Sequence, residues 1–254
     1  MNRNKALVLY TLGTLGQIWA ICIMVFVLRR SGMVVDYTSS IGMVAIAIGG
    51  TSSAIWGIII AVKYKKYELK KILKDFLNVK QEYHSYLLVI LFLCLDFFAI
   101  AFNGKFLISS WYIPFVLFFK AILFGGIEEI GWRYFFQPIL QERYKYVLST
   151  IITFVLWGLW HFSYFYIEGT LSQVKGVSFL IGLLVNCFIL SALYIKTNSL
   201  WICVMTHALI NVFSQLAVGG NQYVSYVCKI IIIVMAVVLS SQKQNKSETN
   251  ISVL

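Results

Sequence analysis

The sequence predicts an all-α fold, a polytopic membrane bundle of about eight transmembrane helices. Of the 254 residues, 60% are apolar and only 12% are charged, and the mean hydropathy is +0.82. Ordinary soluble domains are about 45–50% apolar and about 25% charged, so the excess apolar surface must face lipid. The same composition excludes collagen-like, disordered and disulfide-scaffold classes. It also makes nucleic-acid binding a poor explanation of the net charge of +11.

A membrane-spanning helix needs about 20 mostly apolar residues, and the chain contains eight such runs. The first run resembles a signal sequence, but it is too long and has no small-x-small cleavage site, which favours an uncleaved span. The predicted spans are residues 6–28, 41–62, 86–102, 111–140, 147–166, 177–195, 199–217 and 223–240.

The distribution of basic residues orients these spans. With the N-terminus inside, fourteen Lys and Arg residues fall on the cytoplasmic side and four on the opposite side. Cytoplasmic loops of membrane proteins are enriched in Lys and Arg, and an even number of spans puts both termini on one side. We therefore expect a multi-pass plasma-membrane protein with both termini in the cytoplasm. The Ile-, Lys- and Asn-rich composition favours a bacterial membrane.

One membrane domain with three parts is the simplest organisation. Residues 1–110 are predicted to form N-terminal transmembrane helices with a basic cytoplasmic loop at 63–84, and residues 111–217 a central core. Residues 218–254 then hold the last transmembrane helix and a polar cytoplasmic tail. Lysines alternate with apolar residues at helix-like spacing in 63–80. This pattern fits either an amphipathic helix on an anionic inner leaflet or a solvated loop.

Ionisable side chains inside the predicted spans require explanation, because each costs several kcal/mol unless it is paired or hydrated. We expect Asp96 and Lys120, which lie at comparable depth on adjacent helices, to neutralise one another. The complete set is Asp96, Lys120, Glu128, Glu129, Arg133, His161, His207 and Lys229.

Two adjacent carboxylates, Glu128 and Glu129, point about 100° apart on a helix and can therefore have different roles. Arg133 follows Glu129 by four residues, which places the two on one face as a charge-assisted pair and leaves Glu128 free. The alternative is a helix end near the membrane interface, where these charges are simply solvated.

Depth favours a site over a solvated helix end. Glu128 lies sixteen residues before Tyr144 in the polar turn at 141–145, and His161 lies seventeen after it. If the first helix continues to about residue 140, with a bend near Pro138, an antiparallel hairpin brings both to the same level. His207 reaches a similar depth on its own helix, with Asn211 four residues later on the same face. Trp157, four residues before His161, is expected to pack beside it.

This constellation suits the hydrolysis of an amide bond. A carboxylate and a histidine, here Glu128 and His161, can hold and deprotonate a water molecule, while His207 and Asn211 can donate hydrogen bonds to an oxyanion. A metal site is the alternative, since Glu128, His161 and His207 form a plausible zinc set, although no HExxH motif is present. No serine or cysteine lies in a nucleophile motif.

The ordered motifs Glu128-Glu129-x-x-x-Arg133, Trp157-x-x-x-His161 and His207-x-x-x-Asn211 resemble those of the CPBP family, the CAAX prenyl proteases and bacteriocin-processing or immunity proteins also called Abi. The resemblance covers about residues 111–217. It implies that Glu128 and His161 activate water, that His207 and Asn211 stabilise the oxyanion, and that Glu129 and Arg133 are supporting residues. It implies a metal-free mechanism, with zinc as the alternative. Tyr134 stands where the family usually has Gly, and Trp157 where it usually has Phe.

Three functions are compatible with these residues. The first is an intramembrane endopeptidase acting on a membrane-anchored peptide, lipoprotein or lipidated substrate within the lipid bilayer. The second is acyl transfer onto a membrane lipoprotein amine, since amide hydrolysis and amide formation use overlapping groups. The third is a binding or bacteriocin self-immunity protein, in which the Glu and His residues are dispensable. The sequence predicts no oligomeric state.

Overall fold

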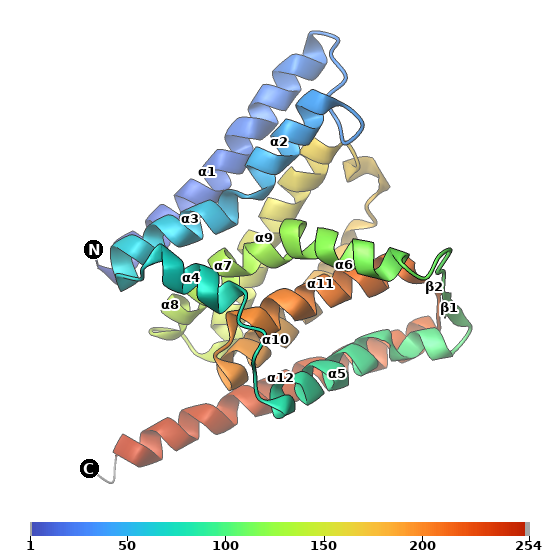
Figure 1. Cartoon of the computed structure of the whole chain (residues 1–254). Coiled ribbons are helices and arrows are strands. Elements are labelled where there is room, and N and C mark those ends of the chain that lie inside the picture. Colours follow the sequence, from blue (N-terminus) through green and yellow to red (C-terminus); the bar gives the residue numbers. More distant parts are fainter. Residues whose placement is uncertain (1, 252–254) are drawn as a thin grey trace.

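The computed structural model describes residues 2–251 and confirms the predicted all-α fold (Figure 1). Residues 252–254, the end of the predicted polar tail, lie outside the described residues. The helices are α1 (Arg3–Arg30), α2 (Ser40–Gly50), α3 (Ser52–Ile60), α4 (Leu69–Phe76), α5 (Tyr83–Phe97), α6 (Ile113–Phe124), α7 (Glu129–Gly131), α8 (Gln137–Gln141), α9 (Tyr146–Glu168), α10 (Gly176–Thr197), α11 (Leu200–Leu216) and α12 (Gln222–Ile251). Shorter turns are the π-helical η1 (Ala61–Lys65) and η4 (Trp132–Phe136) and the 3-10 turns η2 (Phe98–Ala101), η3 (Gly126–Glu128) and η5 (Leu171–Gln173). Strands β1 (Gly104–Phe106) and β2 (Ala217–Gly219) pair antiparallel.

Within the described residues, six helical segments are long and apolar enough to cross a membrane. The chain is therefore a multi-pass membrane protein, but the predicted number of eight spans is not confirmed. The predicted span 111–140 is broken after α6, and α11 has only 17 residues. The six segments are Arg3–Arg30, Ser40–Lys65, Tyr83–Ala101, Tyr146–Glu168, Gly176–Thr197 and Gln222–Ser241.

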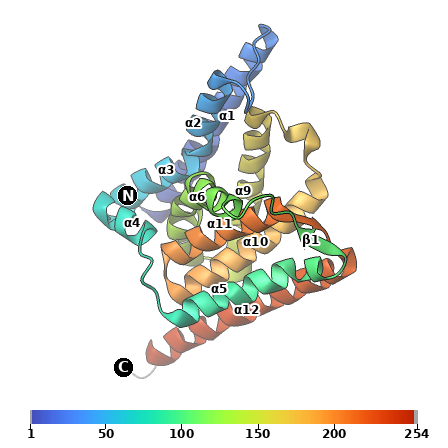
Figure 2. The same cartoon turned by 45° about the vertical axis from the view of Figure 1, so that its right-hand side comes forward.

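The helices form two arms that meet at a central layer. Helices α1 and α2 run beside α9 in one arm, and α5 runs beside α12 in the other, with α6 and α11 between them (Figures 1 and 2). The N-terminus, α4, α8 and the C-terminal end of the chain lie toward one end of the bundle, and the β1–β2 ribbon lies toward the other. The predicted basic side of the protein is thus gathered at one end. Which face of the membrane it occupies stays a prediction.

The segment that carries the two adjacent glutamates is held in place where a glycine of α3 packs against a glycine of α7. A Cβ atom on Gly57 of α3 would lie 2.6 Å from the Cα of Gly131 in α7, and one on Gly131 would lie 2.3 Å from the carbonyl oxygen of Ser53. Because neither position has room for a side chain, the backbones of α3 and α7 approach directly. Tyr10 of α1, which is fully buried, stacks on Phe136 just beyond. Helices α1 and α3 therefore position α7, the short helix that begins at Glu129.

The predicted helix 111–140 is interrupted because its middle must pass close to α11. A Cβ on Gly126 would lie 2.8 Å from a methyl carbon of Val204, so glycine is required where the chain turns from α6 into η3. The π-helical turn η4 follows, and Pro138 occupies the first turn of α8, where a missing backbone N–H is tolerated. The result is a chain of short helical pieces at membrane depth, buried against their neighbours rather than exposed to lipid.

Candidate active site

The four predicted catalytic residues line one cavity. This cavity has a volume of about 420 Å³ and lies between α6, η3, α9, the start of α10, and α11. Its polar lining includes Glu128, His161, His207 and Asn211, which come from three separate segments of the chain. Apolar and aromatic side chains, among them Phe124 and Phe179, form much of the rest of the wall. Polar groups that converge in a pocket beside apolar side chains are the usual arrangement of a ligand or active site.

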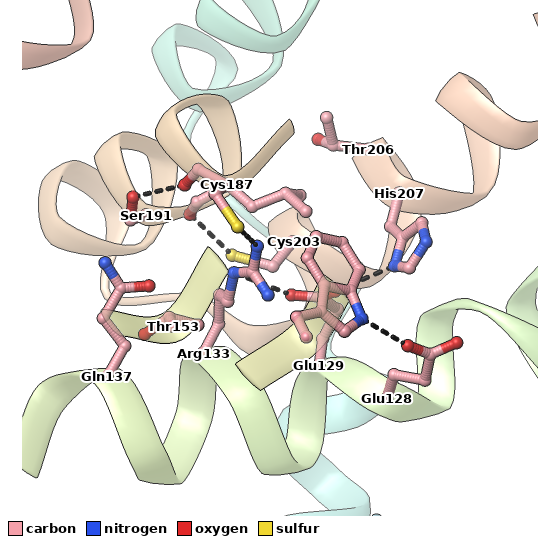
Figure 3. A network of polar contacts seen from close by, with 12 residues as sticks. Glu128, Glu129, Arg133, Gln137, Thr153, Cys187, Ser191, Cys203, Thr206 and His207 are labelled. Atoms are coloured by element: carbon pink, nitrogen blue, oxygen red, sulfur yellow. Dashed lines mark hydrogen bonds and ion pairs between the residues drawn. The ribbon is translucent and has the colours of Figure 1, made fainter. Parts of the chain in front are cut away.

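Glu128 is nearly buried, with 4% of its surface exposed, and it ends the 3-10 turn η3. The indole Nε1 of Trp157 donates a hydrogen bond of 2.7 Å to its Oε2 atom (Figure 3). The sequence predicted Trp157 only as a packing neighbour of His161, so this bond to Glu128 was missed. The sequence indication of this bond was the residue type at position 157, because Trp has an indole N–H donor and the Phe that the family usually has there does not. Glu128 has no cation paired with it among the described residues.

Glu129 points away from Glu128 and contacts two basic side chains, those of Arg133 and His207. Its Oε2 lies 3.5 Å from Nε of Arg133, both side chains being fully buried, so the predicted i, i+4 pair is present. Its Oε1 lies 2.8 Å from Nδ1 of His207 on α11, a contact that the sequence did not indicate (Figure 3). The Arg133 guanidinium also lies 4.3 Å from the ring centroid of Trp157 and donates to Sγ of Cys187. A solvated helix end is therefore the wrong interpretation of these charges.

His161 is oriented by its own helix. Its Nδ1 lies 2.9 Å from the carbonyl oxygen of Trp157 one turn earlier, so Nδ1 carries the proton in this contact and Nε2 is the basic nitrogen. The imidazole packs between the edges of aromatic rings, including Trp157 at 4.9 Å and Trp160 at 5.0 Å between centroids. Among the hydrogen bonds of the described residues, none joins Glu128 directly to His161. The two share the cavity, and a water molecule between them is the arrangement that the expected chemistry requires.

Asn211 and His207 lie over the backbone at Gly125, just before η3. A Cβ atom on Gly125 would be 2.5 Å from Nδ2 of Asn211 and 3.2 Å from Nε2 of His207. Because His207 uses Nδ1 to contact Glu129, its Nε2 is the ring nitrogen on the cavity side. Two side-chain nitrogens therefore pack against the backbone of Gly125, at a position where only a glycine fits. The sequence did not lead us to predict a role for Gly125, although the Gly-Gly pair directly before the glutamates was its signal.

The alternative zinc set does not fit this geometry well. Among residues 2–251, no three His, Cys, Asp or Glu side chains are arranged to hold a metal ion, so Glu128, His161 and His207 do not form a ready three-ligand site. We therefore derive no step through a metal.

One expected pairing outside the site is wrong. Asp96 on α5 lies 3.6 Å from Nζ of Lys229 on α12, not next to Lys120. These two helices pack side by side in the lower arm, which hydropathy runs do not reveal (Figure 1). Lys120 instead lines the cavity that contains Glu128.

Comparisons with known proteins agree with the motifs. Residues 109–213 match the family model described as type II CAAX prenyl endopeptidase Rce1-like. The chain is also 28% identical over 123 residues to a protein of Methanococcus maripaludis named CAAX prenyl protease 2. That alignment covers 45% of this chain and 45% of the relative, so it spans less than half the length of either protein. These matches confirm the resemblance expected from the sequence, that of residues 109–213 to the CPBP-type, Rce1-like intramembrane proteases.

Proposed function

We propose that the chain is an intramembrane endopeptidase that hydrolyses a peptide bond close to the membrane anchor of its substrate. One observation carries the proposal: Glu128, His161, His207 and Asn211 line a single cavity between helices of a membrane bundle. The relative's name points to lipidated, prenylated proteins as the substrate class. The Phe-rich wall of the cavity supports an apolar chain beside the peptide.

In the proposed reaction, water between Glu128 and the basic Nε2 of His161 attacks the carbonyl carbon. Glu128 takes the water proton and returns it to the leaving amine as the C–N bond breaks, which is general acid–base catalysis by one carboxylate. The hydrogen bond from Trp157 holds the Glu128 carboxylate in place during both transfers.

The oxyanion would form beside Asn211 and His207, on the cavity side of Gly125. Asn211 Nδ2 can donate there whatever the protonation state of His207. His207 can donate from Nε2 when its ring is an imidazolium, because Nδ1 is bonded to Glu129. Donors that are already in place cost no reorganisation when the charge develops. Arg133 holds Glu129 in position without touching the substrate.

The test compares membrane peptides and lipoproteins, by mass spectrometry, from cells carrying the wild-type protein, Glu128→Gln or His161→Ala. Loss of a general base costs about 10²- to 10⁴-fold in rate, so we expect an uncut peptide to accumulate in both variants. Glu82→Gln, at an exposed glutamate outside the cavity, is the matched control and should behave as wild type. Undiminished cleavage by Glu128→Gln would rule out the general-base role. A lipoprotein that loses an acyl group would indicate acyl transfer instead, and no difference at all would favour a binding or immunity role.

A further inference from the structure

Helix α4 has two different apolar faces. One face packs on the bundle: Ile72 is fully buried, and Asp75 accepts a 2.6 Å hydrogen bond from the hydroxyl of Tyr134 and another from Lys71. Tyr134 lies in η4, which directly follows α7, so α4 is attached to the segment that carries Glu128 and Glu129. The sequence-based choice between an amphipathic helix and a solvated loop is thereby decided in favour of a helix.

The opposite face exposes a stripe of leucines. Leu69, Leu73 and Leu77 follow one another at four-residue spacing and are 52%, 51% and 64% exposed. An already docked helix has no need of a second apolar face in water, where a contiguous exposed patch marks an interaction site.

Lysines border this stripe. Lys70, Lys74 and Lys80 are exposed and, among the described residues, take part in no hydrogen bond or ion pair. Together with Leu73 and Leu77 they surround a shallow hollow of about 500 Å³, which Asn78 and Val79 also line. Residues 63–80 contain seven lysines and only two acidic residues, so the charge of this region is strongly positive.

Chain connectivity keeps the surface at the membrane boundary. The spanning segment Ser40–Lys65 ends four residues before Leu69, and the segment Tyr83–Ala101 begins three residues after Lys80. Four extended residues reach at most about 14 Å, so α4 cannot move far from the ends of the two spans. An apolar stripe edged by lysines at this level matches the acyl chains and phosphates of a lipid, with the lysine stems lying along the apolar zone.

We propose that the exposed face of α4 and the following residues to Lys80 form a binding surface for anionic phospholipid headgroups. The leucines contact the acyl chains and the three lysines contact the phosphates. Because the hydrogen bond between Asp75 and Tyr134 joins α4 to η4, bound lipid also holds the preceding segment, which carries Glu128 and Glu129. This inference concerns lipid binding and does not depend on the protease proposal.

The test measures lipid retention by the full-length protein in detergent micelles, using native mass spectrometry with equal amounts of phosphatidylglycerol and phosphatidylcholine. Each lysine near an anionic lipid contributes roughly fivefold in affinity, so phosphatidylglycerol should be retained at least about fivefold over phosphatidylcholine. The preference should disappear in a Lys70→Gln, Lys74→Gln, Lys80→Gln variant. It should also fall as the ammonium acetate concentration rises.

A matched control replaces two exposed lysines elsewhere, Lys105 near the β1–β2 ribbon and Lys175 before α10, by Gln. The control should keep the full preference, and Leu73→Asn with Leu77→Asn should lower retention of both lipids. Equal retention of the two lipids by the wild-type protein would overturn the proposal. So would a preference that survives in the triple variant, or one that the Lys105 and Lys175 control loses equally.

Discussion

Glu129→Gln should destabilise the protein far more than the same change at the neighbouring Glu128. Glu129 and Arg133 are both fully buried and lie 3.5 Å apart. Removing the charge of one member leaves the other uncompensated, which costs about 3–5 kcal/mol. The amide oxygen of the introduced glutamine can still accept from His207, and the Arg133 guanidinium keeps its contact with the Trp157 ring. We therefore expect the lower end of that range, about 3 kcal/mol.

Glu128→Gln should cost about 1 kcal/mol or less. The amide oxygen can accept the hydrogen bond that Trp157 donates, and no cation is left unpaired by the change. For a chain of this size, 1 kcal/mol corresponds to about 2–4 °C in the melting temperature. Glu129→Gln should thus lower the apparent Tm by roughly 6–12 °C and Glu128→Gln by no more than about 4 °C.

A thiol-reactive fluorophore measures these values in detergent, because Cys187, Cys203 and Cys228 are buried and react only on unfolding. Cys94 is exposed and Cys22 is half-buried, so these two contribute a background that is the same in both variants. The reasoning would be refuted by equal Tm values for the two variants, or by a larger decrease for Glu128→Gln. Either result would mean that Glu129 is not the carboxylate that neutralises Arg133.

Two further predictions concern groups that the sequence alone did not identify. Trp157→Phe keeps an aromatic ring beside Arg133 but removes the hydrogen-bond donor to Glu128. In steady-state kinetics it should reduce kcat with little change in KM. In thiol-dye unfolding it should lower the free energy of unfolding by about 1.5–3 kcal/mol. If kcat is unchanged, the indole does not position Glu128. Gly125→Ala should displace the Asn211 amide and reduce activity about 10²- to 10³-fold, as Asn211→Ala should, while the Tm stays close to wild type. A Gly125→Ala enzyme with normal kcat would show that the oxyanion does not form over this residue.

The sequence predicted the fold class and the residues of the cavity because both follow from local signals. Hydropathy identifies segments that face lipid. A charged residue inside such a segment is costly in lipid, so it indicates a functional or paired site within the protein. The i, i+4 spacing of Glu129 and Arg133 determined their pairing, which the structure contains. The roles of the site residues stay predictions.

The remaining features depend on contacts between distant segments. Glycines are compatible with an apolar run, so hydropathy did not reveal the break at Gly125 and Gly126, which arises where the chain crosses α11. The bond between Glu129 and His207, and the pairing of Asp96 with Lys229, join residues 78 and 133 positions apart in the sequence. Such partners are set by which helices become neighbours, and no local pattern encodes that.

The two adjacent glutamates illustrate how burial assigns roles. A buried carboxylate that binds a cation is stabilised as a fixed charge, and Glu129 takes both available partners, Arg133 on its own helix and His207 on α11. Glu128, turned about 100° away, receives only a neutral indole donor and borders the cavity. A proton acceptor in catalysis must exchange protons with water, which an ion-paired and fully buried carboxylate cannot do without breaking its pair. We therefore expect Glu129 to maintain the geometry and Glu128 to be the carboxylate that reacts.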